Sequence, residues 1–362
     1  MERRKFLKGA ALGTAGTALA APAIAASHAP TMTIVSTWPR DFPGLGVSAQ
    51  RLAARITELS EGAIQTEYFA AGERVGALDV FDEVANGNSQ AYIGADYYWT
   101  GKDPSLAYFT AVPFGMTFAE INAWCIYGEG RALWDEVQDQ FGLYGLPAGN
   151  TGTQAGGWFN KEIESADDLK GLKMRIPGLG GQVLSKLGAS TVSLPGGQIY
   201  ENLVSGSIEA TEWVGPYNDY FMKFYEAAKF YYTGGMHEPG AQLSLTSNKS
   251  WWSGLTDTQR AIITAAALEE NANSYYEATA LNGEYLNKLQ DEQGVEVKEF
   301  NEDVWDAMGE AAMEVFEETA AYSDLAARVN ESCQKQMRDF GRGIALFEGQ
   351  FVANRNRIFD IG

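Results

Sequence analysis

One helical segment in the last third of this sequence is too long to belong to a single compact lobe. Thr256 and Gln259 form the Thr-x-x-Gln pattern of a capping box, which marks the start of a helix. From there to about Gln290 no proline interrupts an apolar pattern with helical spacing. At a rise of about 1.5 Å per residue, about 35 residues make a helix of roughly 50 Å. We therefore predict a scaffold helix over 256–293 that crosses two lobes.

The rest of the chain predicts these two lobes. A chain of 362 residues is too long for one ordinary core. Short β-like runs alternate with helical patterns after residue 30, and the alternation returns between 150 and 232, which favours α/β lobes with mainly parallel sheets. The boundary falls near the stretch 143–150, which contains Gly and Pro. The predicted parts are lobe I (30–147, completed by segments after about 235), lobe II (148–232) and a C-terminal helical region (301–362).

The first residues have the pattern of an export signal. Arg3, Arg4 and Lys5 precede a modestly apolar run rich in Ala, Gly and Thr, and small residues close it near Ala26. The paired arginines favour the twin-arginine (Tat) route, which carries folded proteins. The run is too short and too rich in Gly and Thr for a membrane anchor. We predict a cleaved signal at 1–26 and a periplasmic mature protein.

The mature chain is strongly acidic. The signal carries a net charge of +3, so its removal takes the formal net charge from −20 to about −23. Such a surface repels nucleic acid and anionic lipid headgroups, so neither is expected as a partner. Small anions are repelled as well at long range. An anionic ligand would therefore need positive charge supplied locally at its site.

The sequence lacks the motifs of common enzyme classes. His28 lies at the signal junction, and His237 is interpreted as a turn or packing residue because no G-x-S-x-G or H-E-x-x-H pattern accompanies it. The glycine-rich stretch 177–183 fails the G-x-G-x-x-G spacing of dinucleotide sites. Cys125 and Cys333 are the only cysteines, and whether they pair is left open. These features favour a binding protein over an enzyme.

Polar residues at the ends of predicted strands are the candidates for a site. Arg175 ends the strand KMRI, Glu212 and Trp213 end the run IEATEW, Gln154 lies in TQAGGWF, and Glu238 follows in a loop bounded by Gly and Pro. Ligands of open α/β sheets bind beyond the carboxyl ends of strands, so these side chains are expected to face one crevice. Taken singly, Arg175 could form a surface ion pair, Glu212 could cap the next helix, and Gln154 could be a solvated amide.

The central block DDLKGLKMRIPG…GQVLSKLGASTVSLPGGQIYENLVSGSIEATEW resembles the substrate-binding proteins of tripartite ATP-independent periplasmic (TRAP) transporters. The export signal, a GxxQAY strand near 87–92, AVPF at 111–114 and the long C-terminal helix match as well, so the resemblance covers essentially the whole mature chain. It implies two α/β lobes that close a cleft on a small organic anion, and membrane permease subunits as partners. It also implies that Arg175 pairs with the ligand carboxylate, and a planar guanidinium suits that role because it offers two parallel N–H donors.

Two departures from the pattern of many family members point to one subgroup. Where many dicarboxylate and sialic acid binders have Pro and Phe in a strand-helix turn, this chain has SLPGGQIY, and where they have DGxEN it has EATEWVGP. In both places the chain is similar to receptors that bind 2-oxo or 2-hydroxy monocarboxylates with a metal cation. The resemblance implies that Gln154, Glu212, Trp213 and Glu238 surround the cation, and that Gln154, Arg175 and Trp213 contact the ligand.

Oxygen donors of this kind suit sodium, with calcium as the alternative. The two carboxylates, the Gln154 amide and the Trp213 carbonyl could share the cation with the carboxylate and 2-oxo oxygens of a pyruvate-like ligand. Without a cation, Glu212 and Glu238 would oppose an anion at close range. Four aromatic residues are candidates either for the pocket wall or for the core: Tyr97, Tyr98, Trp99 and Trp158.

Three alternatives stay open on the sequence alone. The ligand could be another carboxylate, such as lactate or a dicarboxylate. The chain could be a Tat-exported periplasmic enzyme, although it carries no cofactor motif. The long C-terminal helices could mediate a homodimer.

Overall fold

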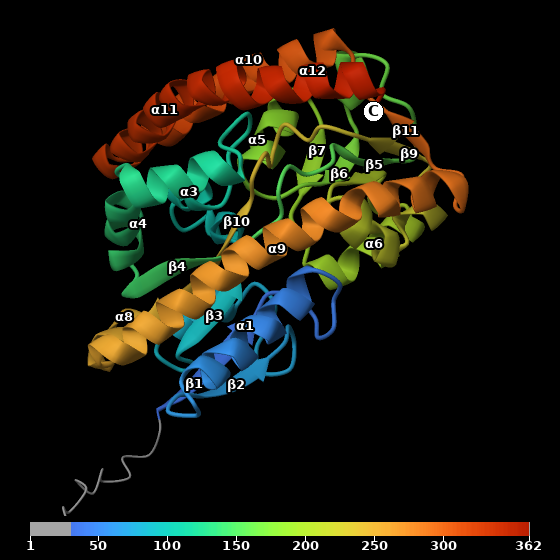
Figure 1. Cartoon of the computed structure of the whole chain (residues 1–362). Helices are drawn as coiled ribbons and strands as arrows, with labels where there is room; N and C mark the ends of the chain where they lie inside the picture. Colours follow the sequence, from blue (N-terminus) through green and yellow to red (C-terminus); the bar gives the residue numbers. More distant parts are fainter. Residues whose placement is uncertain (1–29, 362) are drawn as a thin grey trace, which may run out of the picture.

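The computed structural model describes residues 30–361, and it shows two α/β lobes with long helices running along them (Figure 1). The predicted export signal at 1–26 lies outside the described residues. Within 30–361, no helix is long and apolar enough to cross a membrane. The predicted fold class, a two-lobed α/β protein with long C-terminal helices, is confirmed.

The first sheet begins with the βαβ arrangement that the sequence predicts. Strand β1 (Thr31–Ser36) pairs in parallel with β2 (Gln65–Phe69) on one side and with β3 (Ala91–Gly94) on the other. Helices α1 (Leu45–Leu59) and α2 (Val80–Ala85) make the two crossovers. Buried apolar residues recur along α1 with helical spacing, so one face of α1 packs into the core.

Two antiparallel strands complete this sheet, whose order is β2-β1-β3-β10-β4. Strand β10 (Gln242–Asn248) lies between β3 and β4 (Leu143–Asn150), and it is antiparallel to both. The chain therefore returns to its first sheet after building the second one. The stretch 143–150, near which the sequence places the boundary between the lobes, is strand β4, and after it the chain passes to the second sheet. It is a strand because β10 pairs with it along its whole length, with one register shift between Leu243 and Ser244.

The second sheet is built from very short strands in the order β11-β9-β5-β8-β6-β7. Strands β6, β7 and β8 are parallel neighbours, whereas β5 is antiparallel to both β8 and β9. Helices α5 (Gly178–Lys186) and α6 (Gly196–Val204) connect β6 to β7 and β7 to β8. The strands are β5 (Gly157–Phe159), β6 (Lys173–Arg175), β7 (Ser190–Val192), β8 (Ala210–Thr211), β9 (Phe230–Tyr232) and β11 (Glu296–Lys298).

The predicted scaffold helix is α9 (Asp257–Asp291), a single helix of 35 residues that starts at the predicted capping box on Thr256. It contacts helices of both lobes. Near its middle, Glu270 accepts a hydrogen bond of 2.7 Å from the Ser48 hydroxyl of α1. Further along, Asn282 accepts one of 3.2 Å from the backbone N–H of Tyr217 in α7 (Pro216–Met222). The helix therefore fastens the two lobes to one rigid element.

Three further helices, α10 (Glu302–Ala320), α11 (Asp324–Ile344) and α12 (Gln350–Phe359), gather on one side of the molecule, away from β1 and β2 (Figure 1). Lys186 of α5 forms an ion pair of 2.7 Å with Glu318 of α10. Trp124 of α3 (Phe118–Tyr127) donates a hydrogen bond of 3.1 Å to Ser332 of α11. These helices thus also touch both lobes. Helices α4 (Gly130–Asp139) and α8 (Lys249–Gly254) are the remaining α-helices of residues 30–361.

The two cysteines lie in this helical layer, on α3 and α11. Cys125 and Cys333 are both buried, and both carry free thiols. Burial raises the pKa of Cys125 to about 11, so its thiol is protonated and unreactive at neutral pH.

A buried carboxylate, Asp219, lies in α7 behind the second sheet. Its Oδ2 accepts hydrogen bonds from the Trp158 indole at 3.0 Å and the Tyr231 hydroxyl at 3.1 Å, and its Oδ1 accepts one from the Val214 N–H at 3.1 Å. Burial raises the pKa of Asp219 from 3.8 to about 7 in spite of these donors. Asp219 therefore fixes the backbone at Val214, next to Trp213, and its contribution to the free energy of unfolding depends on pH.

We predict that Asp219→Asn changes the pH dependence of stability. The raised folded-state pKa means that the folded protein binds the proton more tightly than the unfolded chain does. Wild-type stability should therefore fall as the pH rises from about 4 to about 7, by an amount on the order of 4 kcal/mol for this group. Asn cannot titrate, so the variant does not lose this contribution. Its free energy of unfolding in urea, relative to that of the wild type, should therefore be higher at pH 8 than at pH 5.

The control for this prediction is Asp167→Asn, because Asp167 is exposed and pairs only with Lys170 at the surface. Its difference from the wild type should be the same at both pH values. A difference between wild type and Asp219→Asn that does not change with pH would contradict the prediction.

Candidate functional site

Parallel strand pairing brings the first two candidate residues together. Arg175 is the last residue of β6, and Thr211, the residue before Glu212, is its register partner on β8. The Glu212 N–H donates a backbone hydrogen bond of 3.2 Å to the Arg175 carbonyl. The two side chains therefore leave the sheet next to each other at the carboxyl edge, where ligands of α/β sheets bind.

Backbone hydrogen bonds between three segments bring the other candidates to the same place: two of the segments pass between the two sheets, and the third follows β8. The Gln154 N–H donates to the Glu238 carbonyl at 3.0 Å, and the Gly235 N–H donates to the Gln154 carbonyl at 2.9 Å. The Ala155 N–H donates to the Val214 carbonyl at 3.0 Å. These bonds hold the segments around 154, 214 and 238 side by side, so residues more than 80 positions apart in sequence share one site.

A buried ion pair forms the centre of the cluster. Arg175 Nη1 donates to Glu212 Oε1 in a short contact and also to the Glu212 carbonyl at 3.3 Å, and Arg175 Nε donates to the Leu194 carbonyl at 3.2 Å. The exposed fractions of the two side chains are 1% and 0%. Arg175 is therefore not in a surface ion pair. Glu212 does not cap α7, which begins after Gly215 without a side-chain cap.

Gln154 connects this centre to the second carboxylate. Its Nε2 donates to Glu238 Oε2 at 2.6 Å and to the Thr151 hydroxyl at 3.1 Å. The residue is 4% exposed, so it is not a solvated amide. With the amide nitrogen committed to Glu238, the amide oxygen of Gln154 is free to face another group.

Five buried polar atoms in and around the cluster have no hydrogen-bond partner among the described residues. They are Gln154 Oε1, Arg175 Nη2, Glu212 Oε2, Trp213 Nε1 and His237 Nε2. Buried polar atoms are normally paired, and so many orphans in one place indicate a site for an external ligand. The set contains both acceptors, which suit a cation, and N–H donors, which suit an anion.

His237 belongs to the cluster, although the sequence suggested only a turn or packing residue. Its Nε2 lies 3.4 Å from Glu212 Oε2, and the residue is buried. One potential ligand atom each of Glu212, His237 and Glu238 lie within 4.8 Å of one another. A lone histidine without a motif gave no signal of its own. Its position directly before Glu238 in the nominated loop was the signal that could have found it.

Within the cluster only Glu212 has a cationic partner, and the second carboxyl group, Glu238, has none of its own. Burial raises the pKa of Glu238 well above its usual range, and the charge of Glu212 raises it further. Burial alone would lower the pKa of Arg175, but Glu212 and the other acidic groups near it raise this pKa above its ordinary value, so the guanidinium stays charged. Without a cation Glu238 therefore favours its protonated form, whereas Glu212 has its counter-charge in Arg175. A bound cation would allow both carboxyl groups to be ionised.

The four aromatic candidates divide into two pairs. The charges of Arg175 and Glu238 affect the pKa values of Tyr97 and Tyr98, and Tyr97 lies against Gly178 at the start of α5. Burial raises the pKa of both tyrosines, so both hydroxyls remain protonated donors. In contrast, the Trp99 indole donates to the Leu78 carbonyl at 2.8 Å, and the Trp158 indole donates to Asp219. Trp99 and Trp158 are therefore core residues, whereas the tyrosines lie near the charged groups of the cluster.

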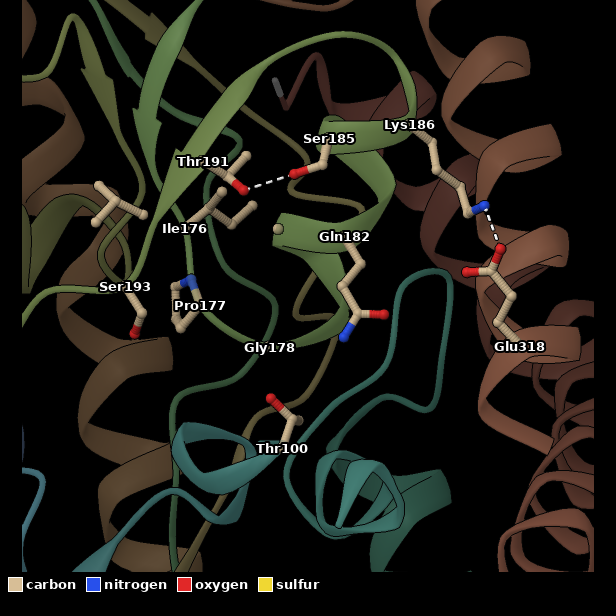
Figure 2. Close-up of a pocket in the computed structure, with 12 residues that line it drawn as sticks. Thr100, Ile176, Pro177, Gly178, Gln182, Ser185, Lys186, Thr191, Ser193 and Glu318 are labelled. Atoms are coloured by element: carbon tan, nitrogen blue, oxygen red, sulfur yellow. Dashed lines mark hydrogen bonds and ion pairs between the residues drawn. The ribbon is translucent and has the colours of Figure 1, made fainter. Parts of the chain in front are cut away.

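An open hollow of about 490 Å³ lies beside the end of β6. Figure 2 shows Gln182 of α5 and Thr100, from the segment after β3, facing each other across it. Pro177 and Ser193 also line it, whereas Arg175 and Glu212 do not and are almost fully buried. The cluster is therefore closed to solvent in this structure.

The fold and the cluster define a two-lobed receptor for a small charged solute. The family of bacterial extracellular solute-binding proteins, family 7 (DctP), matches residues 34–322. The chain belongs to this family, the solute receptors of TRAP transporters, as the sequence predicted.

The chain is similar to a monocarboxylate 2-oxoacid-binding periplasmic protein of Nostoc sp., with 39% identity over 91% of this chain and 92% of the relative. A TRAP periplasmic solute-binding protein of Pseudoalteromonas atlantica, solved with bound sodium and pyruvate, is 37% identical with a TM-score of 0.87 over 90% of this chain and 98% of that chain. A TRAP periplasmic solute-binding protein of Colwellia psychrerythraea, solved with bound calcium and pyruvate, is 36% identical with a TM-score of 0.87 over 90% and 99%. These relatives are binding proteins, so the enzyme alternative is not supported.

We predict that Arg175→Ala destabilises the folded protein, because Glu212 would then lie buried without its counter-charge. Removing one partner of a buried ion pair costs about 3–5 kcal/mol. The free energy of unfolding, measured by urea titration in ligand-free buffer, should fall by an amount in this range.

The control for Arg175→Ala is Arg328→Ala, because Arg328 forms an exposed pair with Glu136. Loss of such a pair should cost less than about 1 kcal/mol. Equal losses of stability in the two variants would show that Arg175 does not neutralise the buried carboxylate of Glu212.

Proposed function

We propose that this protein is the periplasmic receptor that captures a pyruvate-like 2-oxoacid together with a metal cation. The observation that carries the proposal is the buried guanidinium of Arg175, which has one unpartnered nitrogen beside two unpartnered oxygen acceptors within the described residues. The relatives solved with pyruvate and either sodium or calcium support the same pairing of ligand and cation.

Arg175 supplies the positive charge that an anion needs in so acidic a protein. Its Nη2 is free to donate to the ligand carboxylate, while Nη1 and Nε are held by Glu212 and the Leu194 carbonyl. These bonds fix the plane of the guanidinium before the ligand arrives, which lowers the entropic cost of binding. Trp213 Nε1 is a second buried donor without a protein partner among residues 30–361.

The acceptors of the cluster fit a hard cation. Gln154 Oε1, Glu212 Oε2 and the Glu238 carboxylate, with the Trp213 carbonyl, would hold sodium or calcium. When bound, the cation supplies positive charge between the carboxylates and the anionic ligand. The oxygen-rich donor set favours these ions over zinc or copper, which prefer nitrogen and sulfur ligands.

The same cluster argues against a dicarboxylate ligand. A second ligand carboxylate would need its own counter-charge, and Arg175 is the only arginine or lysine side chain among the residues assigned to the cluster. A buried charge without a partner costs several kcal/mol. A monocarboxylate with a neutral 2-oxo group avoids that cost.

The place of action and the membrane partner follow from the family. We propose that the mature chain works in the periplasm and delivers its ligand to the permease subunits of a TRAP transporter, because the matched family and the Nostoc relative are extracytoplasmic binding proteins. Closure of the lobes over the cluster would signal the loaded state to the permease.

Isothermal titration calorimetry tests this function. The purified protein, stripped of bound ligand by mild denaturation and refolding, is titrated with pyruvate, 2-oxobutyrate, lactate and succinate, each with and without sodium or calcium. We expect the 2-oxoacids to bind most tightly, and only when a cation is present. Tighter binding of succinate, or pyruvate affinity that no cation changes, would refute the proposal.

For the clamp itself, we predict that Arg175→Lys weakens pyruvate binding by about 100-fold or more, although it keeps the charge. Lysine has no planar pair of donors and cannot keep the bonds to Glu212 and Leu194 while it contacts the ligand. The control is Arg40→Lys, since Arg40 pairs with Glu73 at the surface. Near-normal affinity of Arg175→Lys would rule out the clamp.

We further propose that the receptor is a homodimer built on its C-terminal helices. None of the residues of α12 is buried. Apolar side chains of α12 and of the π-helical turn before it, at 345–349, are solvent-exposed and together are called the apolar face. The exposed side chains are Leu346, Phe347, Phe351, Val352, Ile358 and Phe359. So large an apolar surface is unusual on a monomer.

A groove of about 870 Å³ between α10 and α11 can receive this face from a second copy. Phe114, Trp305 and Met313 give the groove an apolar floor, and Asp306, Glu310 and Glu317 add negative charge at its edges. Helix α12 carries the basic residues Arg355 and Arg357 beside its apolar face. The two surfaces are thus complementary in polarity and in charge, which favours a second copy of this chain as the occupant.

We predict that the double variant Phe347→Glu and Phe351→Glu is monomeric in sedimentation equilibrium, whereas the wild-type protein is a dimer at micromolar concentration. Both substitutions place charge on the exposed apolar face, and neither touches the cluster around Arg175. Tyr127→Glu, at the exposed end of α3, is the control and should stay dimeric. If the wild-type protein is still monomeric at about 50 µM, the proposed dimer is refuted.

A further inference from the structure

We propose that Gly196 determines where the Trp213 indole stands and thereby limits the length of the ligand that the site accepts. The inference rests on the proposed function and adds a residue that sets ligand size. It starts from the contact between the first turn of α6 and the residue that follows Glu212.

Gly196 is needed for space and not for backbone conformation. It is the first residue of α6, after Pro195, and it is not among the glycines with positive φ. A Cβ atom added to Gly196 would lie 2.4 Å from Cη2 and 2.8 Å from Cζ3 of Trp213, closer than real Cβ contacts allow. The backbone would therefore accept alanine, but the indole in its present place would not.

The Trp213 ring has little room to move away. The Phe42 ring packs edge-on against it, with centroids 5.5 Å apart and an angle of 79°. The Arg175 guanidinium lies over it, with Cζ 5.4 Å from the ring centroid. Trp213 is 4% exposed. A side chain at 196 would thus push the indole toward Phe42 and Arg175, that is, toward the place where the ligand carboxylate binds.

The turn before α6 holds Arg175 as well. The Leu194 carbonyl accepts the hydrogen bond from Arg175 Nε at 3.2 Å, two residues before the glycine that meets the indole. One short turn therefore positions both the charged group and the aromatic wall beside it. A shift of this turn would move the two together, and its effect would appear in ligand affinity.

This contact joins the two stretches that set the sequence apart, SLPGGQIY and EATEWVGP. Gly196 belongs to the first stretch and Trp213 to the second. A bulky residue at 213 requires the smallest residue at 196, so the two positions form one steric pair. The ring atoms that meet Gly196 belong to the six-membered ring of the indole, and phenylalanine at 213 would leave part of their volume empty.

The test is a double-mutant cycle measured by calorimetry with pyruvate, 2-oxobutyrate and 2-oxovalerate in sodium or calcium buffer. Gly196→Ala should weaken pyruvate binding about tenfold, the size of effect expected from overpacking a filled site, and should weaken 2-oxovalerate binding more. Trp213→Phe should raise the affinity for 2-oxovalerate relative to pyruvate, because it shortens the wall. In the Trp213→Phe background, Gly196→Ala should cost less than about twofold, because the Cβ then meets empty space.

Gly197→Ala is the matched control. Gly197 is the next residue in the same helical turn, it is exposed, and a Cβ there would meet only Pro39 at an ordinary 3.4 Å. Its pyruvate affinity should stay within about twofold of the wild type, since no neighbour has to move. An equal loss in Gly197→Ala and Gly196→Ala would mean that the helix start matters and the indole contact does not, and would overturn the inference.

The outcomes separate this inference from the function on which it rests. Additive losses in the cycle, in a wild-type protein that binds pyruvate with a cation, overturn the steric pair alone. A wild-type protein that binds none of the three 2-oxoacids overturns the proposed function.

In that case the thermal unfolding midpoint still tests the contact. Gly196→Ala should lower this midpoint when Trp213 is present, and should lower it much less in the Trp213→Phe background. If Gly196→Ala does not fold, folding of the double variant supports the pair, and failure of both overturns it.

Discussion

The buried pair of Arg175 and Glu212 is the interaction around which the rest of the structure is arranged. Taking two charges out of water is expensive, and it is tolerated only where geometry and further hydrogen bonds compensate. Here the compensation comes from the end of β6, the end of β8 and the turn before α6, which supply the two side chains and the Leu194 carbonyl. The second lobe can therefore be understood as a frame that holds one guanidinium in a fixed plane.

The pair does not neutralise its surroundings, and this imbalance explains the chemistry of the site. Glu238 adds a second carboxyl group. The amide nitrogen of Gln154 donates a hydrogen bond to it, and the amide oxygen of Gln154 stays unpaired among the described residues. The cluster thus offers donors on one side and acceptors on the other. Such a site suits an ion pair better than a single ion, which is why the proposal couples an organic anion to a metal cation. The net charge of −20 fits the same view, since attraction has to be local.

Much of the fold could be predicted from the sequence, because local patterns decide it. The capping box at Thr256 and the absence of proline fixed the start and the length of α9, and the βαβ alternation predicted the parallel part of both sheets. That 143–150 is itself a strand was not predicted. Its pairing partner β10 lies about 100 residues later, and such a distant partner leaves no mark on the stretch itself.

For the site, the sequence determined which chemical groups were available, and the tertiary structure decided which of them meet. Strand-end positions and the family resemblance nominated Arg175 and Glu212, because parallel strands end at one edge of a sheet. The burial of both groups, the place of His237 beside Glu212 and the contact of Gly196 with Trp213 could not be predicted in this way. They depend on how strands, turns and loops pack against one another once the chain has folded. Their distances are set by packing, and packing is a property of the whole chain and not of any one segment.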